Sequence, residues 1–305
     1  MTTKFDQHFF NIFYGRRCNL ACDGCSSGSD IVRHRNTDPD LQRTLDSIPK
    51  IADHFNIVNQ FTLLGGDPFL YWDDRIVPIV RELRKHFPTT KIAILTNGLL
   101  LSRNKESVLD FMKEIDYVNI DITNHFDGLV DESAALTWRD NLMDFLLDDR
   151  IYKISDDHYH VKGNINLNIT MHRQDDWSVM YQTLPTGQIK PYATKDPAGS
   201  MKYGCGAGNI CSVLSEGRVW KCNALASVAA RLKEKNQLND PDWAPYLAYR
   251  PVDLLNINAD DLQNFCDTYS EPIAQCDMCS NRPESLIKWS ERTRTRVLPN
   301  KKETY

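Results

Sequence analysis

The sequence lacks the features that would place it in or across a membrane. No apolar run approaches the ~18 residues that a bilayer-spanning helix needs, and the opening residues, MTTKFDQHFF, lack a basic segment followed by an apolar stretch. There is also no low-complexity tract, and 41% hydrophobic with 25% charged residues is an ordinary globular composition. We therefore predict a cytoplasmic globular protein that has no membrane partner.

An excess of positive charge is also missing. The formal net charge is −5, so nothing in the composition indicates the broad basic face that neutralises a nucleic-acid backbone, and we expect no nucleic-acid partner. The eight histidines form no metal motif, because the pair His158 and His160 has no third spaced ligand. We expect that pair to lie in a surface loop.

Short β-rich runs alternate with amphipathic helical stretches through the first two thirds of the chain, a pattern typical of a parallel sheet. Helices are expected over 73–87 and 105–115, and the segment 152–162 interrupts the rhythm without a clear place. The pattern predicts an α/β fold with a partial (β/α)6 TIM-like barrel over residues 1–195, and a smaller cysteine-rich domain over 196–305. The six expected strands are residues 9–15, 58–66, 91–98, 117–123, 164–170 and, least clearly, 188–194.

Nine cysteines in a reducing compartment are better explained as metal ligands or redox centres than as disulfides. Cys18, Cys22 and Cys25 lie directly after the first predicted strand, at the rim where barrel enzymes build their active sites. Three thiolates do not complete a tetrahedral zinc site, but they could hold three irons of a [4Fe–4S] cluster and leave the fourth iron open. The alternatives are a zinc knob or three unrelated buried thiols.

This CxxxCxxC spacing after the first strand resembles the signature of the radical S-adenosylmethionine (SAM) superfamily. The resemblance implies that Cys18, Cys22 and Cys25 bind a [4Fe–4S] cluster whose open iron chelates the amino and carboxylate groups of SAM. It also implies reductive cleavage of SAM to methionine and a 5′-deoxyadenosyl radical, which abstracts a hydrogen atom from a substrate. A reductant such as flavodoxin or ferredoxin would be a partner.

The second strand ends in LLGGDPFL, which is similar to the GGEP motif of that superfamily. The resemblance implies that Gly65, Gly66, Asp67 and Pro68 form the turn that meets the amino group of SAM. Further polar residues follow later strands and are candidates for contacts to SAM or substrate: Thr96, Asn97, Asp121 and Asn168. Asp121 is also the first candidate for an acid or base in catalysis, and a ribose contact or a structural role is an equal alternative.

One departure from the superfamily concerns the residue before the third cysteine, which is commonly aromatic and packs near the adenine. Here that residue is Gly24. Tyr14, Phe69 and Tyr71 are candidates to cover the adenine instead. The alternative interpretation is that these aromatic residues belong to the core, because Phe and Tyr in strands are usually buried.

Six cysteines remain in the C-terminal third. The four residues between Gly217 and Cys222, together with the later CxxC of Cys276 and Cys279, resemble the auxiliary-cluster extensions called SPASM and twitch domains. No cysteine follows Cys279, so the resemblance implies one auxiliary [4Fe–4S] cluster. Cys222, Cys276 and Cys279 are the expected ligands, Cys205 and Cys211 compete for the fourth place, and Cys266 is the weakest candidate; a zinc site is the alternative.

The resemblance thus implies an oxidoreductase or isomerase type of radical enzyme that oxidises, epimerises or rearranges its substrate. Many peptide maturases carry an N-terminal peptide-recognition domain, which is not expected here because the first predicted strand begins so early. That favours a small molecule, such as a sugar or nucleotide derivative, over a peptide substrate for a maturase or epimerase. Two further alternatives are a glycyl-radical activating enzyme and an iron–sulfur electron carrier. The electron-carrier interpretation would leave the GGDP motif unexplained.

Overall fold

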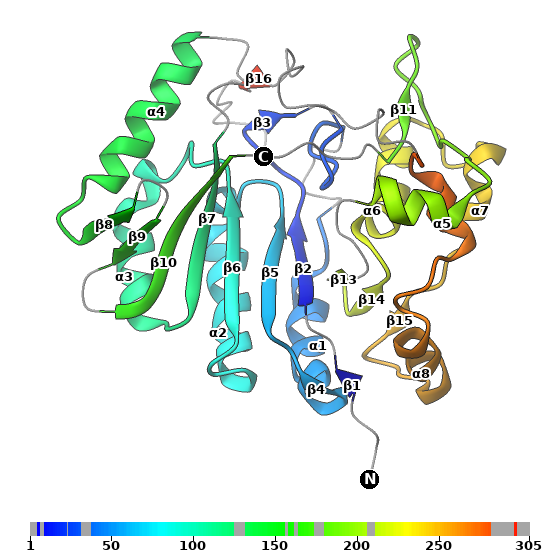
Figure 1. The fold of residues 1–305 in the computed structure, drawn as a ribbon, viewed down its shortest axis with the longest axis horizontal. Helices are drawn as coiled ribbons and strands as arrows, with labels where there is room; N and C mark the ends of the chain where they lie inside the picture. Colours follow the sequence, from blue (N-terminus) through cyan, green and yellow to red (C-terminus); the bar gives the residue numbers. More distant parts are fainter. Residues whose placement is uncertain are drawn as a thin grey trace.

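A computed structural model gives the fold of the chain, with side chains (Figure 1). Within the described part, no helix is both long and apolar enough to cross a bilayer. The ranges that the structure describes are residues 5–6, 9–22, 24–31, 38–124, 132–155, 158–161, 164–173, 180–205, 211–281 and 296–297.

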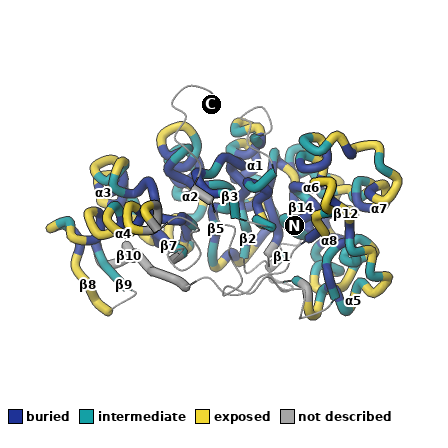
Figure 2. The backbone as a smooth tube through the Cα atoms, turned by 90° about the horizontal axis from the view of Figure 1, so that it is seen from above, coloured by how far each residue is buried: buried dark blue, intermediate teal, exposed yellow. Residues whose placement is uncertain are grey.

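The centre of the molecule is a ten-stranded sheet whose middle strands run parallel. Several of these strands carry buried apolar side chains at alternate positions, such as Phe10 with Ile12, Ile92 with Ile94, and Ile120 with Ile122. Helices α1, α2 and α3 lie along one side of it (Figure 2). The predicted α/β class with a parallel sheet is therefore confirmed. In sheet order the strands are β15 (Val252–Asp253), β14 (Arg218–Trp220), β13 (Cys211–Ser215), β2 (Phe9–Gly15), β5 (Gln60–Gly65), β6 (Lys91–Thr96), β7 (Val118–Asn124), β10 (Asn164–Arg173), β9 (His158–Val161) and β8 (Ile151–Ser155).

The helices bury apolar stripes against this sheet. The helix α1 (Leu41–His54) begins at Asp40, whose side chain accepts a hydrogen bond from the backbone N–H of Arg43 at 3.1 Å. Both helices predicted from periodicity are present: the first is α2 (Val77–His86), entered through a π-helical turn over Trp72–Ile76, and the second is α3 (Lys105–Glu114).

The remaining elements are β1 (Phe5–Asp6), β3 (Leu20–Ala21), β4 (Phe55–Ile57), β11 (Gln182–Thr183), β12 (Ile189–Lys190), β16 (Arg296–Val297), α4 (Glu132–Leu146), α5 (Pro197–Gly199), α6 (Asn223–Glu234), α7 (Ala244–Leu247), α8 (Ala259–Asp267), short 3₁₀ turns over Pro68–Leu70, Ser102–Asn104, Pro241–Trp243 and Ala274–Met278, and a π-helical turn over Ser200–Gly204.

The prediction of a sixth barrel strand over 188–194 is wrong. Within that segment β12 pairs antiparallel with β11 in a separate two-stranded sheet. Pro191 lacks an N–H for continuing a ladder, and the N–H groups of Tyr192 and Thr194 instead donate to the carbonyls of Met278 and Asp277 at 3.0 and 3.1 Å. The additional parallel strand is β13, on the far side of β2.

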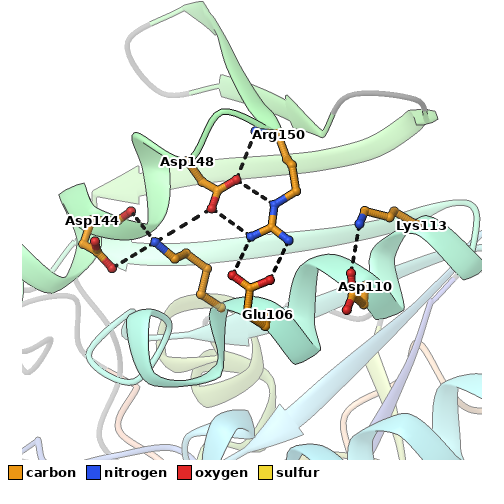
Figure 3. Close-up of polar contacts among 7 residues, drawn as sticks. Glu106, Asp110, Lys113, Asp144, Asp148 and Arg150 are labelled. Atoms are coloured by element: carbon orange, nitrogen blue, oxygen red, sulfur yellow. Dashed lines mark hydrogen bonds and ion pairs between the residues drawn. The ribbon is translucent and has the colours of Figure 1, made fainter.

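The unplaced segment 152–162 contributes an antiparallel hairpin, β8 and β9, that extends the sheet beyond β10. His158 and His160 therefore lie on a strand and not in the predicted surface loop, with their ring centroids 5.0 Å apart. Salt bridges tie the turn before this hairpin to α3, and α3 to α4 (Figure 3). Arg150 contacts both carboxylate oxygens of Glu106 at 2.8 Å, and it also pairs with Asp148.

A second apolar cluster lies apart from the main core. It joins Met180, Tyr181 and Ile189 to residues of α6 and to Trp243 and Met278. Residues on both sides of position 195 thus pack together, and β13 to β15 share the sheet with the first half of the chain. The division into domains of residues 1–195 and 196–305 stays a prediction.

Candidate active site

The first three cysteines lie in the loop after β2, at the carboxyl end of the parallel strands (Figure 1). Cys22 and Cys25 are joined by a turn in which the Cys25 N–H donates to the Cys22 carbonyl at 3.2 Å. The sulfur of Cys18 accepts hydrogen bonds from the N–H of Leu20 at 3.4 Å and from Nδ2 of Asn97 at 3.6 Å. Such donors suit a thiolate that binds iron.

The three thiols are electrostatic neighbours. The pKa of Cys18 is raised chiefly by burial, and next by the negative charges of Asp67, Cys22 and Cys25. A cation shared by these sulfurs would remove that penalty, which is the behaviour of a metal site. In the described ranges, however, no three His, Cys, Asp or Glu side chains are arranged to hold a metal ion. The ligand roles of the cysteines therefore stay predictions.

The turn after β5 is fastened directly to the backbone that leads into the cysteine loop. The Gly66 N–H donates to the Gly15 carbonyl and the Asp67 N–H to the Arg17 carbonyl, each at 2.9 Å. A Cβ on Gly66 would lie 1.7 Å from the Arg17 oxygen, and one on Gly65 would lie 2.5 Å from the Gly15 oxygen. Both glycines are therefore required by the close approach of two backbones.

Asp67 is buried, with 1% of its surface exposed, and it connects the ends of β5 and β6. Its carboxylate accepts hydrogen bonds from Phe69 N–H at 3.0 Å, Thr96 Oγ1 at 2.8 Å and Asn97 N–H at 3.4 Å. Burial raises the pKa of Asp67 to about 6, and these three donors oppose the rise. Pro68 then opens the short 3₁₀ turn.

Asn97 reaches from the end of β6 to the cysteine loop. Nδ2 of Asn97 donates to Oδ1 of Asn19 at 2.8 Å, in addition to its contact with Cys18, and Oδ1 of Asn97 accepts from the Leu99 N–H at 3.0 Å. The indole of Trp138 on α4 donates to the Asn97 carbonyl. Asn19 was not predicted as a site residue, and its position beside Cys18 was the only signal in the sequence.

The three aromatic candidates for covering an adenine are core residues in this structure. The Tyr14 hydroxyl donates to the Gly66 carbonyl at 2.8 Å, and its ring packs edge to face against Tyr71 at 5.5 Å. Tyr71 accepts from the Arg17 N–H, and Phe69 stacks on Trp72. Burial, followed by the charge of Asp67, raises the pKa of Tyr14. An adenine contact by Tyr14 stays a prediction.

The strand register places Asp121 on the other face of the sheet from Thr96. Asp121 pairs with Leu95, whereas Thr96 pairs with Ile122, and side chains alternate between faces along each strand. Asp121 is buried and accepts a hydrogen bond from Nδ2 of Asn119, two residues earlier on the same face. Asn168 lies on β10 at the register position beside Asn119, and its side chain is outside the described part.

Four of the C-terminal cysteines are electrostatic neighbours: Cys205, Cys222, Cys276 and Cys279. Burial raises the pKa of Cys279 most, and the other three sulfurs raise it further. Burial likewise raises the pKa of Cys222 to about 12, partly opposed by N–H groups at the start of α6. This set has the composition expected of either a [4Fe–4S] cluster or zinc.

The other two C-terminal cysteines are placed differently. Cys266 lies on α8, where its neighbours belong to the main core. Burial, together with the charge of Asp267, raises the pKa of Cys266 to about 12. Cys211 begins β13, where its backbone pairs with Phe9, and its side chain is outside the described part. The competition between Cys205 and Cys211 for the fourth ligand position therefore stays open.

Comparisons with known proteins concern the same part of the chain. Residues 12–132, which contain the cysteine loop, the GGDP turn, Asn97 and Asp121, match the model of the radical SAM superfamily. The chain is similar to Molybdenum cofactor biosynthesis protein 1 of Dictyostelium discoideum, with 32% identity over 107 residues, 34% of this chain. The match spans only 16% of that relative.

Among solved structures, the chain resembles BtrN in complex with AdoMet and 2-DOIA, with 15% identity and a TM-score of 0.43 over 94% of this chain and 100% of that chain. It also resembles native anSMEcpe with bound AdoMet, with 14% identity and a TM-score of 0.32 over 45% of this chain and 41% of that chain.

Proposed function

We propose that the chain is an enzyme that cleaves SAM reductively and uses the resulting 5′-deoxyadenosyl radical to abstract a hydrogen atom from a substrate, because residues 12–132 match the radical SAM superfamily model. One observation carries the proposal. The GGDP turn is hydrogen-bonded to the backbone of Gly15 and Arg17, immediately before Cys18. Two motifs separated by about 40 residues of chain thus form a single site, as binding one ligand requires.

In the proposed enzyme, the cysteines and the two glycines of this site would have different roles. Cys18, Cys22 and Cys25 would hold a [4Fe–4S] cluster, which supplies the electron for SAM cleavage when bound. Gly65 and Gly66 let the end of β5 pack against the backbone of Gly15 and Arg17, and the strand end held there would meet the amino group of SAM.

Three polar residues of the site would have supporting roles. The carboxylate of Asp67 holds Thr96 and the Asn97 N–H at the end of β6, and Asn97 contacts the Cys18 sulfur.

We propose a small-molecule substrate, such as a sugar or nucleotide derivative, that is oxidised, epimerised or rearranged. The support is the polar character of the sheet face that carries Asp121. Asn119 lies on that face, and the register adds Asn11 and Thr62 on the neighbouring strands β2 and β5. Amide, hydroxyl and carboxylate groups suit a hydroxyl-rich molecule. Asp121 would contact this substrate or accept its proton, and a peptide substrate is the alternative.

For the second cysteine group we propose one auxiliary [4Fe–4S] cluster held by Cys205, Cys222, Cys276 and Cys279, with zinc as the alternative. Its role would be to accept an electron in an oxidation or to help position the substrate. The electrons for SAM cleavage would come from a partner such as flavodoxin or ferredoxin in the cytoplasm.

The test is the formation of 5′-deoxyadenosine by protein prepared without oxygen and given dithionite and SAM. The proposed enzyme forms deoxyadenosine, and Cys18→Ala protein does not. An electron carrier would keep its iron yet neither bind nor cleave SAM, so intact clusters without deoxyadenosine would refute the proposed function.

A further inference from the structure

A buried arginine from the C-terminal half of the chain contacts the loop of the first three cysteines. Arg231 lies on α6, has 1% of its surface exposed, and packs among residues of the second apolar cluster and not in the main core. One guanidinium nitrogen donates to the carbonyls of Cys25 at 2.8 Å and Ser26 at 2.7 Å. Figure 1 shows α6 to the right of β2, beside this loop.

Two other residues of the C-terminal half, Asn223 and Tyr181, also bind the loop of the first three cysteines. Asn223, at the start of α6, donates from Nδ2 to the Ser26 carbonyl at 2.6 Å. The guanidinium carbon lies 5.2 Å from the centre of the Tyr181 ring, and the Tyr181 hydroxyl donates to Oδ2 of Asp30 at 2.8 Å. Residues 25 to 30 are thus held along their length by the C-terminal half of the chain.

Gly28 shows that the loop is shaped around this side chain. Its φ is +80°, and a Cβ at this position would lie 2.7 Å from Nε of Arg231. A side chain at position 28 would therefore displace the guanidinium as well as strain the backbone. Burying a cation is costly unless it is well paired, and the contacts that offset this cost for Arg231 include the two loop carbonyls and the Tyr181 ring.

The helix that carries Arg231 begins at the other cysteine group. Cys222 is the N-cap of α6, nine positions before Arg231 in the sequence. The charge of Arg231 also acts on Cys279, where it opposes the effect of the neighbouring sulfurs. A single rigid helix thus connects a cysteine of the second group with the third cysteine of the first.

We propose that Arg231 is a positioning residue that fixes Cys25 and so holds the first cluster in the place where SAM binds, with α6 setting that place relative to the second cysteine group. This inference rests on the proposed function. It assigns a requirement to the C-terminal half: the SAM-cleaving site is complete only when α6 is docked on the cysteine loop.

The experiment compares Arg231→Met, Arg231→Lys and Arg43→Met with the unaltered protein. Arg43 is the matched control, because it also joins the two halves, through the Glu216 carbonyl at 3.1 Å and Asp253 at 3.3 Å, but contacts no residue of the cysteine loop in these bonds. The readouts are iron per chain, the unfolding temperature, and the change that SAM causes in the electron paramagnetic resonance spectrum of the dithionite-reduced protein.

For Arg231→Met we expect a SAM affinity that is lower by about tenfold or more, from the loss of two charge-assisted hydrogen bonds, with iron at the second site retained. Arg231→Lys should recover part of the affinity, and Arg43→Met should leave it unchanged. A SAM-induced spectral change in Arg231→Met equal to that of the unaltered protein would overturn the proposal.

If Arg231→Met does not fold, Asn223→Ala tests the same contact. It removes one donor to the loop from a partly exposed position, and a smaller loss of SAM affinity is expected; an unchanged affinity would count against the proposal. Failure of the proposed function itself looks different, because then the unaltered protein shows no SAM-induced change and forms no deoxyadenosine.

Discussion

Replacing Gly66 by alanine should separate the GGDP turn from the cysteine loop. The new Cβ would lie 1.7 Å from the Arg17 carbonyl oxygen, whereas non-bonded carbon contacts are comfortable only near 3.5 Å, so one backbone must move by roughly 1.5 Å or more. That movement breaks the hydrogen bonds from the N–H groups of Gly66 and Asp67 to Gly15 and Arg17. The oxygen belongs to the backbone, so no side-chain rotation relieves the contact.

The loss of stability expected for Gly66→Ala follows from these broken contacts. Two backbone hydrogen bonds are worth about 1 kcal/mol each, and overpacking in a tight site costs about 1–3 kcal/mol. We therefore expect the free energy of unfolding to fall by about 3–5 kcal/mol, and the unfolding temperature by roughly 5–10 °C.

The assay is thermal unfolding followed by circular dichroism, together with deoxyadenosine formation. Gly187→Ala is the control, because a Cβ there would meet no atom within 4 Å and its positive φ costs only about 1–2 kcal/mol. If Gly66→Ala matches the unaltered protein in both readouts, the close approach of the two backbones is not what builds the site.

Three further predictions concern ionisation, the second cysteine group and stability. The raised pKa of Asp67, about 6 against 3.8, means that its ionisation disfavours folding. The contribution of Asp67 to the free energy of unfolding is fully present below pH 3.8 and is lost as pH rises through 6, by about 3 kcal/mol in all and by about 1.4 kcal/mol between pH 5 and 7.5. Urea unfolding should show this loss relative to Asp67→Asn, and parallel pH curves would contradict it. Cys222→Ala should lower anaerobic iron by about four per chain, the content of one cluster, while Cys266→Ala keeps it; equal iron in the two variants would be the contrary result. Ile94→Ala, at a position with no exposed surface, should lower the free energy of unfolding by about 2–5 kcal/mol. Arg150→Ala, which breaks the pairs with Glu106 and Asp148 near the surface, should lower it clearly less. Equal losses in chemical unfolding would show that the core assignment is wrong.

The parts of the fold that the sequence predicts are those governed by local periodicity. The runs at 9–15, 91–98 and 117–123 contain strands, because their alternating residues place a buried apolar row on one face of the sheet, as with Ile120 and Ile122. The segment 188–194 resembles a strand in sequence but contains Pro191. The N–H groups of Tyr192 and Thr194 donate instead to the carbonyls of Met278 and Asp277, inside the later CxxC. Local pattern does not encode that distant partner.

The candidate site also combines features that the local sequence predicts with contacts that it does not predict. The cysteine loop was recognised from the spacing of Cys18, Cys22 and Cys25, whereas the GGDP turn, Thr96 and Asn97 were predicted from the resemblance to the radical SAM superfamily; their roles stay predictions. The contacts that hold the loop could not be found in this way, since Arg231 is more than 200 residues from Cys25 and resembles any arginine on an amphipathic helix. Whether Tyr14 covers an adenine or packs in the core depends on three-dimensional burial, which its position on a strand does not reveal.

The central claim is that Cys18, Cys22 and Cys25 support reductive cleavage of SAM. The most direct measurement is deoxyadenosine formed per chain, without oxygen and with dithionite, in the unaltered protein and in Cys18→Ala. The account predicts deoxyadenosine from the unaltered protein and none above background from Cys18→Ala. Equal amounts from the two proteins, or none from unaltered protein with a full complement of iron, would contradict it.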